Sequence, residues 1–258
     1  MRILLLLAGV MDPKWPLDWP AAGGLPPRRP DRVILSPFDE AALELALRLR
    51  DRDMAGVEVR ALVIGAEDTA RTARTVAAFR VETSRMVLPE ASLWDVAAIA
   101  RAAIPQIRRE APDLLLIGRE FGDHDDGTLP AYLAGLLDRP CFTLAQEAAC
   151  SDGRVLFMRE RADSEEWVTI DRPAVVSVTN DRRNRLRKPL MKNVMAARQA
   201  ELPEVPAPVP PDHDTARLLS AVPHGVGREQ VAGRVLSGPV ATQVAELAHL
   251  LRQWQVSR

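Results

Sequence analysis

The stretch Asp113-Leu-Leu-Leu-Ile117 leads into the polar loop Gly118-Arg-Glu-Phe-Gly-Asp-His-Asp-Asp-Gly-Thr128. Residues 114–117 are an unbroken apolar run, which is typical of a strand buried on both faces. A helix is expected directly after the loop, from Thr128 to Leu137. A buried strand that passes through a loop into a helix is the repeating unit of a parallel sheet.

The same pattern recurs on the N-terminal side of this stretch. Ser36 and Pro37 are typical of an N-cap and a first helical residue, and acidic Asp39 and Glu40 follow where a helix favours negative charge. Further strands are expected at residues 2–8, 57–64 and 84–88, and helices at 37–52, 67–79 and 93–109. This alternation predicts an α/β fold with a parallel, doubly wound sheet and helices on both faces. Ligands of such sheets bind at the carboxyl ends of the strands, here Gly9, Ser36, Gly65 and Gly118.

The pattern changes after residue 140. Antiparallel strands are expected at residues 142–149, 154–161 and 166–170, with a hairpin turn at 151–153, and another strand is expected at residues 172–178. Residues 180–192 are strongly basic, residues 201–212 are a Pro-rich linker, and residues 240–254 form a helix. We expect one domain over residues 1–200 and an extension over residues 201–258.

Composition excludes several classes of function. The net charge of −1 provides no field for nucleic acid, so no nucleic-acid partner is expected. Cys141 and Cys150 fit neither a disulfide framework nor a zinc site, and are expected to be thiols in a reducing compartment. The N-terminal apolar run of about seven residues is too short to cross a membrane or to act as a signal peptide. We therefore expect a cytoplasmic protein with no membrane insertion.

No arrangement of side chains predicts an enzyme. His124, His213, His224 and His249 stand in none of the spacings used for metal binding, and no nucleophile elbow, Walker A loop or dinucleotide glycine motif occurs. We expect neither a catalytic residue nor a metal site. An ATP-using enzyme of this architecture would need a glycine-rich phosphate loop, which is absent.

The loop from Gly118 to Thr128 leaves three interpretations open. Its backbone N–H groups at a helix start can bind an anion, with Thr128 as a cap or a phosphate donor. Asp123, Asp125 and Asp126 can accept from a ribose or bind a cation, although their spacing is not that of an EF-hand. The third interpretation is an acidic helix cap without a ligand, since three carboxylates repel phosphate.

Five segments together resemble the beta subunits of electron transfer flavoproteins (ETF). Ser36-Pro-Phe-Asp-Glu-Ala-Ala-Leu-Glu-Leu-Ala-Leu-Arg-Leu-Arg50 resembles the family's N-P-[FY]-[DC]-E segment and the helix after it. Residues 118–130 resemble its G-[RK]-Q-x-x-D-x-D loop, and residues 134–140 its A-x-L-L-x-x-P. Residues 172–176 resemble its L-P-A-[VL]-[VI], and residues 184–198 its recognition loop. The segments occur in the same order and at similar spacing over most of residues 1–200.

The resemblance implies an adenine nucleotide alpha hydrolase-like (Rossmann-like) sheet with a β-hairpin region and an extended C-terminal arm that packs on the partner. It implies an ETF alpha subunit as partner, which mainly binds the FAD, and an AMP in this subunit. A flavin dehydrogenase would donate electrons, and ETF-quinone oxidoreductase would pass them to the quinone pool. Phe38 would lie beside the flavin, and Met191 would take the place of the leucine that docks on dehydrogenases. The implied cofactor-binding residues are Leu6, Ser36, Pro37, Phe38, Asp39, Ile64, Gly118, Arg119, Glu120, Phe121, Gly122, Asp123, His124, Asp125, Asp126, Gly127, Thr128 and Leu129.

Several positions depart from the family pattern. Ser36 replaces its Asn, Glu120 and Thr128 replace two Gln, and Pro130 replaces a closing Gly. These departures bear on AMP more than on the fold, and the resemblance leaves AMP retention and electron bifurcation open. The alternative function is a stand-alone, universal-stress-like nucleotide-binding protein, which would need no hairpin region, basic loop or C-terminal arm.

Overall fold

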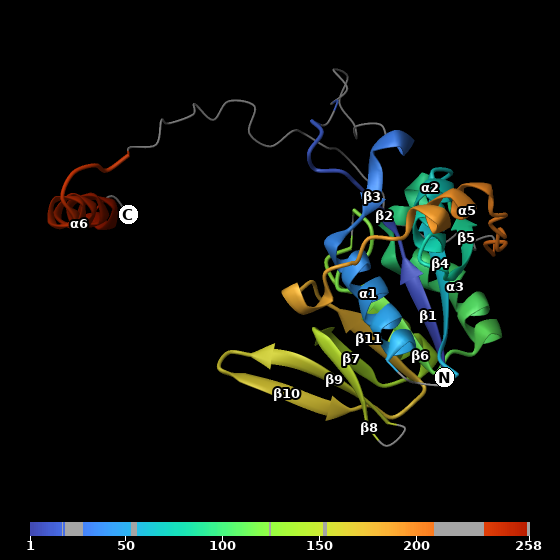
Figure 1. Ribbon diagram of the computed structural model, residues 1–258. Coiled ribbons are helices and arrows are strands. Elements are labelled where there is room, and N and C mark those ends of the chain that lie inside the picture. The colour runs from blue at the N-terminus through green and yellow to red at the C-terminus, as the bar shows by residue number, and fades with distance from the viewer. Residues whose placement is uncertain are drawn as a thin grey trace.

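A parallel sheet forms the centre of the molecule in the computed structural model (Figure 1). The structure describes residues 1–16, 18, 28–52, 56–123, 125–151, 154–208 and 235–256. The strand order is β5-β4-β1-β6-β11-β7, and every pair in it is parallel. The strands are β1 (Arg2–Leu7), β4 (Glu58–Gly65), β5 (Glu82–Val87), β6 (Leu114–Gly118), β7 (Cys141–Ala145) and β11 (Ala174–Val178). The predicted parallel α/β fold is confirmed.

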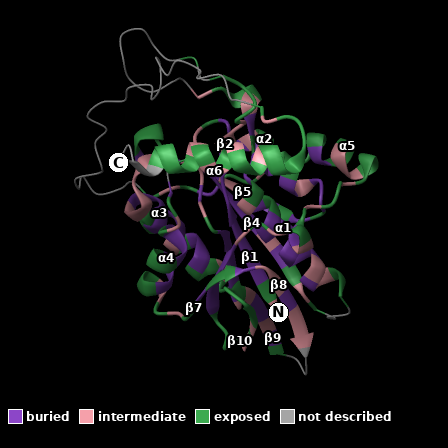
Figure 2. Cartoon of the chain, turned by 90° about the vertical axis from the view of Figure 1, so that its left-hand side faces the viewer, coloured by how far each residue is buried: buried purple, intermediate pink, exposed green. Residues whose placement is uncertain are grey.

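Helices cover both faces of this sheet, as the doubly wound prediction requires. Alternate residues of β1 divide between two cores, with Leu5 on the side of α1 and α2 and Leu6 on the side of α3 and α4. The helices are α1 (Pro37–Asp51), α2 (Thr69–Ala77), α3 (Val96–Glu110), α4 (Leu129–Leu137) and α5 (Met191–Gln199). The inner strands β1, β4, β6 and β11 are largely buried, whereas the edge strands β5 and β7 are partly exposed (Figure 2).

The region after residue 140 differs from its prediction. The stretch expected to be one antiparallel strand at residues 142–149 contains two strands in different sheets. β7 joins the main sheet parallel to β11, and β8 (Glu147–Ser151) pairs antiparallel with β9 (Arg154–Arg161), which pairs with β10 (Ser164–Thr169). The chain leaves the main sheet next to Leu144, whose φ is 62°, a conformation that interrupts an extended strand. The strand predicted at residues 172–178 also belongs to the main sheet, as β11.

Several short elements complete the fold. β2 (Gly9–Met11) and β3 (Val33–Leu35) form an antiparallel ribbon at the carboxyl end of β1. The 3-10 turns are η1 (Pro30–Arg32), η2 (Glu90–Trp94) and η3 (Arg182–Asn184).

The C-terminal region begins against the sheet. Arg85 of edge strand β5 exchanges backbone hydrogen bonds with Pro203 and Val205, at 2.9 and 2.8 Å. The described start of the predicted Pro-rich linker therefore extends the sheet edge. The final helix, α6 (Val240–Val256), stands apart from the sheet in Figure 1, and the domain boundary at residue 200 stays a prediction. Among the described helices, none is both long and apolar enough to cross a membrane.

Candidate functional site

The start of α1 is fixed by a reciprocal pair of hydrogen bonds. The backbone N–H of Asp39 donates to Ser36 Oγ at 3.0 Å, and the N–H of Ser36 donates to Asp39 Oδ2 at 3.4 Å. Pro37 occupies the first helical turn, where its missing N–H costs nothing. The cap predicted from the sequence is confirmed.

Asp39 lies wholly inside the protein beneath this cap. Burial raises its pKa to about 8, opposed by hydrogen bonds from Ser36 and the backbone of Ala8. At pH 7 its carboxyl is therefore mostly neutral. The side chain holds the helix start and, with no exposed surface, offers no contact to a ligand in this conformation.

The end of β6 packs directly against the start of α1. A Cβ on Gly118 would lie 2.9 Å from Phe38 Cβ and 3.1 Å from the backbone nitrogen of Asp39, so only glycine allows this approach. The next residue, Arg119, places its guanidinium over the ring of Phe38, at 4.8 Å from the centroid. The two segments singled out from the sequence, 36–39 and 118–129, therefore meet.

Asp125 caps the loop that leads into α4. Its Oδ1 accepts from the N–H groups of Gly127 and Thr128, at 3.0 and 2.8 Å, and its Oδ2 accepts from the N–H of Phe121 at 3.2 Å. The hydroxyl of Thr128 donates to Asp126 and makes no cap of its own. The carboxylate of Asp125 therefore holds the backbone N–H groups of this loop. His124 lies outside the described residues.

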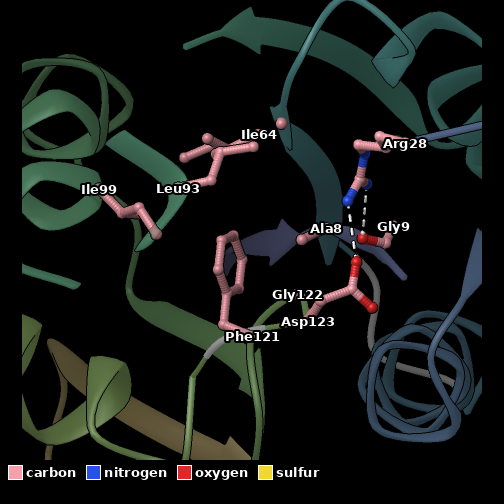
Figure 3. A pocket seen from close by; sticks show the side chains of 10 residues that line it. Ala8, Gly9, Arg28, Ile64, Leu93, Ile99, Phe121, Gly122 and Asp123 are labelled. Atoms are coloured by element: carbon pink, nitrogen blue, oxygen red, sulfur yellow. Dashed lines mark hydrogen bonds and ion pairs between the residues drawn. The ribbon is translucent and has the colours of Figure 1, made fainter. Parts of the chain in front are cut away.

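A second cluster closes the carboxyl ends of β1 and β4. Arg28 Nε donates to Asp68 Oδ2 at 2.6 Å, and its Nη1 donates to Asp123 Oδ2 at 2.8 Å. Its Nη2 donates to the carbonyl oxygen of Gly9 at 3.0 Å. The dashed lines of Figure 3 mark the contacts of Arg28 with Gly9 and with Asp123. Asp123 also accepts from the backbone N–H of Met11 at 3.0 Å. Residues far apart in the sequence are thereby joined at one edge of the sheet.

The pocket beside Arg28 is small. Its free volume is about 20 Å³, which is room for about one water molecule. Figure 3 shows Phe121 between Ala8 on one side and Ile99 and Leu93 on the other. The pocket lies where parallel sheets bind ligands, but in this conformation side chains fill it.

The expected cofactor residues fall into two groups. Those around the cluster and the loop lie together at the carboxyl edge. Leu6 instead lies within the core under α3 and α4. Ile64 lines the pocket, but its side chain is fully buried. Arg28 and Asp68 were missed, and the sequence holds no signal for them, because Arg28 stands in a Pro- and Gly-rich stretch with no motif.

The basic segment 180–192 is held by ion pairs. Arg187 Nη2 lies 2.8 Å from Oε1 of the buried Glu44, and Arg187 also bonds to Asp51. Arg183 lies 2.8 Å from Glu160 and 2.9 Å from Glu165. Part of the positive charge of this segment is therefore neutralised within the chain.

An exposed apolar patch follows this segment at the start of α5. Met191 is its first helical residue and 74% exposed, and Leu190 and Met195 beside it are 62% and 51% exposed. We call these three residues the α5 patch. Among the described residues, no group of His, Cys, Asp or Glu is placed to hold a metal ion.

Comparisons with known proteins agree with the fold. A family model described as "Electron transfer flavoprotein domain" matches residues 29–210. The mitochondrial electron transfer flavoprotein subunit beta of Oryza sativa subsp. japonica is 31% identical over 243 residues, covering 81% of this chain and 92% of the relative. The beta subunit of Bacillus subtilis (strain 168) is 26% identical over 223 residues, covering 85% and 86%. That of Sus scrofa is 29% identical over 176 residues, covering 67% and 68%.

The parallel sheet and the matched domain together define the class of an electron transfer flavoprotein domain. The chain belongs to the electron transfer flavoprotein family, as a subunit of its beta type.

Proposed function

We propose that this chain pairs with an ETF alpha subunit and forms one wall of a FAD site in the heterodimer. In this proposal it accepts electrons from a flavin dehydrogenase and passes them, through ETF-quinone oxidoreductase, towards the quinone pool. It acts as an electron carrier subunit without catalytic side chains of its own. A cytoplasmic location belongs to the proposal, since Cys141 and Cys150 are unpaired thiols.

The pairing of Phe38 with Arg119 is the observation that carries the proposal. It sets a half-buried aromatic ring and a guanidinium that is 45% exposed at the carboxyl edge of the sheet. FAD, when bound in the complex, supplies the electron chemistry, and the protein tunes it through contacts and charge. Phe38 would contribute an apolar contact, and Arg119 a positive charge that favours a reduced, anionic cofactor.

Two further surfaces support a partnered role over the stand-alone alternative. The α5 patch is apolar, exposed and rich in methionine, which suits an adaptable contact with another protein. The exposed apolar residues of α6 recur at alternating spacings of four and three, the pattern of a helix that packs on another helix. These α6 residues are Val240, Val244, Leu247, Leu251 and Trp254.

Co-expression with an ETF alpha subunit from the same organism tests the proposal. The two chains should elute as one yellow complex, and a dehydrogenase with its substrate should bleach the flavin absorbance under anaerobic conditions. A chain that elutes alone and colourless from the same preparation would contradict the proposed role. The universal-stress-like alternative predicts this second result.

A further inference from the structure

We propose that this subunit binds no AMP, because Arg28 bridges the chain segments and Asp125 occupies the loop N–H groups at the carboxyl edge where the family's nucleotide is expected. The inference rests on the proposed subunit role, since only that role makes a nucleotide expected here. It adds that the chain stabilises this edge with its own charged side chains.

Arg28 joins three segments that a bound nucleotide would otherwise bridge. One segment is the start of β2, directly after β1, through the carbonyl of Gly9. The second is the start of α2, through Asp68, and the third is the loop after β6, through Asp123. The side chains of Arg28 and Asp68 are 15% and 4% exposed. Two carboxylates compensate one guanidinium, so its positive charge is not available to a phosphate.

Asp68 occupies the N-cap position of α2, but its side chain makes no capping hydrogen bond to that helix. Its carboxylate turns to Arg28 instead. An N-cap carboxylate ordinarily stabilises its helix by accepting from the first-turn N–H groups. The contact with Arg28 therefore replaces a capping interaction. This indicates that the ion pair between Arg28 and Asp68 stabilises the edge of the sheet independently of α2.

The donors that a phosphate would use are also occupied. Anions bind at helix starts through free backbone N–H groups. At the start of α4 those of Gly127 and Thr128 donate to Asp125, which is 8% exposed. A phosphate would have to displace the Asp125 carboxylate from these N–H groups. The displaced carboxylate would then lie buried next to the negative charge of the phosphate. Asp123 and Asp126 on the same loop would add to the repulsion.

Space gives the third argument. Ligand pockets for molecules larger than a few atoms measure about 300–1,000 Å³, whereas the pocket beside Arg28 has a free volume of about 20 Å³. Phe121, which is 3% exposed, fills the side away from Arg28 (Figure 3). An adenosine would require both Arg28 and Phe121 to leave their places.

Counting nucleotides in the purified heterodimer tests the inference. After acid denaturation, chromatography of the supernatant should give no AMP above the level of a buffer blank. Addition of 1 mM AMP should leave the midpoint of thermal unfolding unchanged. About one AMP per chain, or a rise of several degrees on adding AMP, would overturn the inference. The FAD peak of the same chromatogram reports on the subunit role separately, so either proposal can fail alone.

Arg28→Met tests the contacts of Arg28 with Asp68 and Asp123 directly. It leaves Asp68 and Asp123 without their partner and should lower the unfolding midpoint by roughly 5–10 °C. Arg29→Gln is the matched control, because the neighbouring Arg29 is 45% exposed and its ion pairs to Asp18 and Asp31 are 3.7 and 3.8 Å long. The control should match the wild type within about 2 °C. If Arg28→Met and Arg29→Gln unfold at the same temperature, the stabilising role of Arg28 is overturned. If Arg28→Met does not fold, the AMP count of the wild-type heterodimer decides.

Discussion

The guanidinium of Arg119 stacks on the ring of Phe38, 4.8 Å from its centroid, and so links the loop after β6 to the first turn of α1. Cation–π contacts of this kind contribute about 0.5–1 kcal/mol at exposed sites. The contact also fixes a positive charge at the surface proposed to face the flavin. Arg119 forms an ion pair with Glu120 as well, so its position is set from two sides.

Arg119→Met should lower the reduction potential of the flavin in the heterodimer. Removing a nearby positive charge disfavours the reduced, anionic cofactor, and a loss of about 1.4 kcal/mol corresponds to about 30 mV for two electrons. Spectroelectrochemical titration measures the shift. Arg154→Met, an exposed arginine of β9, is the control and should leave the potential unchanged. If the two variants have the same flavin reduction potential, Arg119 does not lie close enough to the flavin to affect it.

Asp39→Asn should alter how stability depends on pH. The folded protein holds the Asp39 pKa at about 8, against an ordinary value of 3.8. The folded state therefore retains a proton that the unfolded state loses. The contribution of Asp39 to stability is complete below pH ~4 and is lost as pH rises to ~8, by up to about 1.4 kcal/mol per pH unit.

Urea unfolding of Asp39→Asn at pH 5, 6, 7 and 8 measures this effect. Asparagine keeps an acceptor for the Ser36 N–H and never ionises, so the stability of the variant relative to wild type should rise with pH. Asp163→Asn, in the exposed turn between β9 and β10, should follow the wild-type profile. A constant difference between Asp39→Asn and wild type across this range would show that Asp39 does not titrate there.

Arg187→Met should destabilise the protein and loosen the segment before α5. It removes the partner of Glu44, a carboxylate on α1 whose side chain is 8% exposed. The expected loss is about 1–3 kcal/mol, below that of a fully buried pair because Arg187 is 40% exposed.

Urea unfolding and hydrogen exchange of residues 185–190 measure the two effects of Arg187→Met. Arg182→Met is the control, because Arg182 lies on the same segment and is exposed. It should change neither measurement. If both variants unfold at the same urea concentration, the ion pair with Glu44 does not hold the segment.

Met191→Ala should slow reduction of the heterodimer by its dehydrogenase while leaving the FAD content unchanged. If Met191 is an anchor of this contact, truncating it should cost about 1–2 kcal/mol, which is about 5–30-fold in affinity. Stopped-flow kinetics at varied dehydrogenase concentration measures it. Leu136→Ala, an exposed apolar residue of α4 on the opposite face of the sheet, is the control. Equal rates for both variants would place docking away from the α5 patch.

Local patterns predicted the strands of the main sheet up to β6 and the first helix well. The apolar run before Gly118 and the Ser36 cap of α1 depend on neighbouring residues, so the sequence displays them directly. The break at Leu144 was missed because a change of strand direction leaves no mark in apolar periodicity. The Arg28 cluster was missed because its contacts span 40 and 95 residues of sequence, a separation that local patterns do not reach.

The loop from Gly118 to Thr128 was predicted in outline only. Its position between a buried strand and a helix follows from the sequence, and an acidic cap was among the open interpretations. The choice of Asp125 over Asp123 and Asp126 as the cap depends on backbone geometry, since Asp125 alone accepts from Gly127, Thr128 and Phe121 together. The partner of Asp123 is Arg28, which is remote in the sequence.

The FAD content of the complex with an ETF alpha subunit tests the central claim most directly. Absorbance of the released cofactor, divided by the concentration of heterodimer, should give about one FAD per pair of chains. The alpha subunit expressed without this chain should hold its FAD more weakly. A heterodimer without FAD, or an alpha subunit whose FAD affinity is the same with and without this chain, would contradict the account.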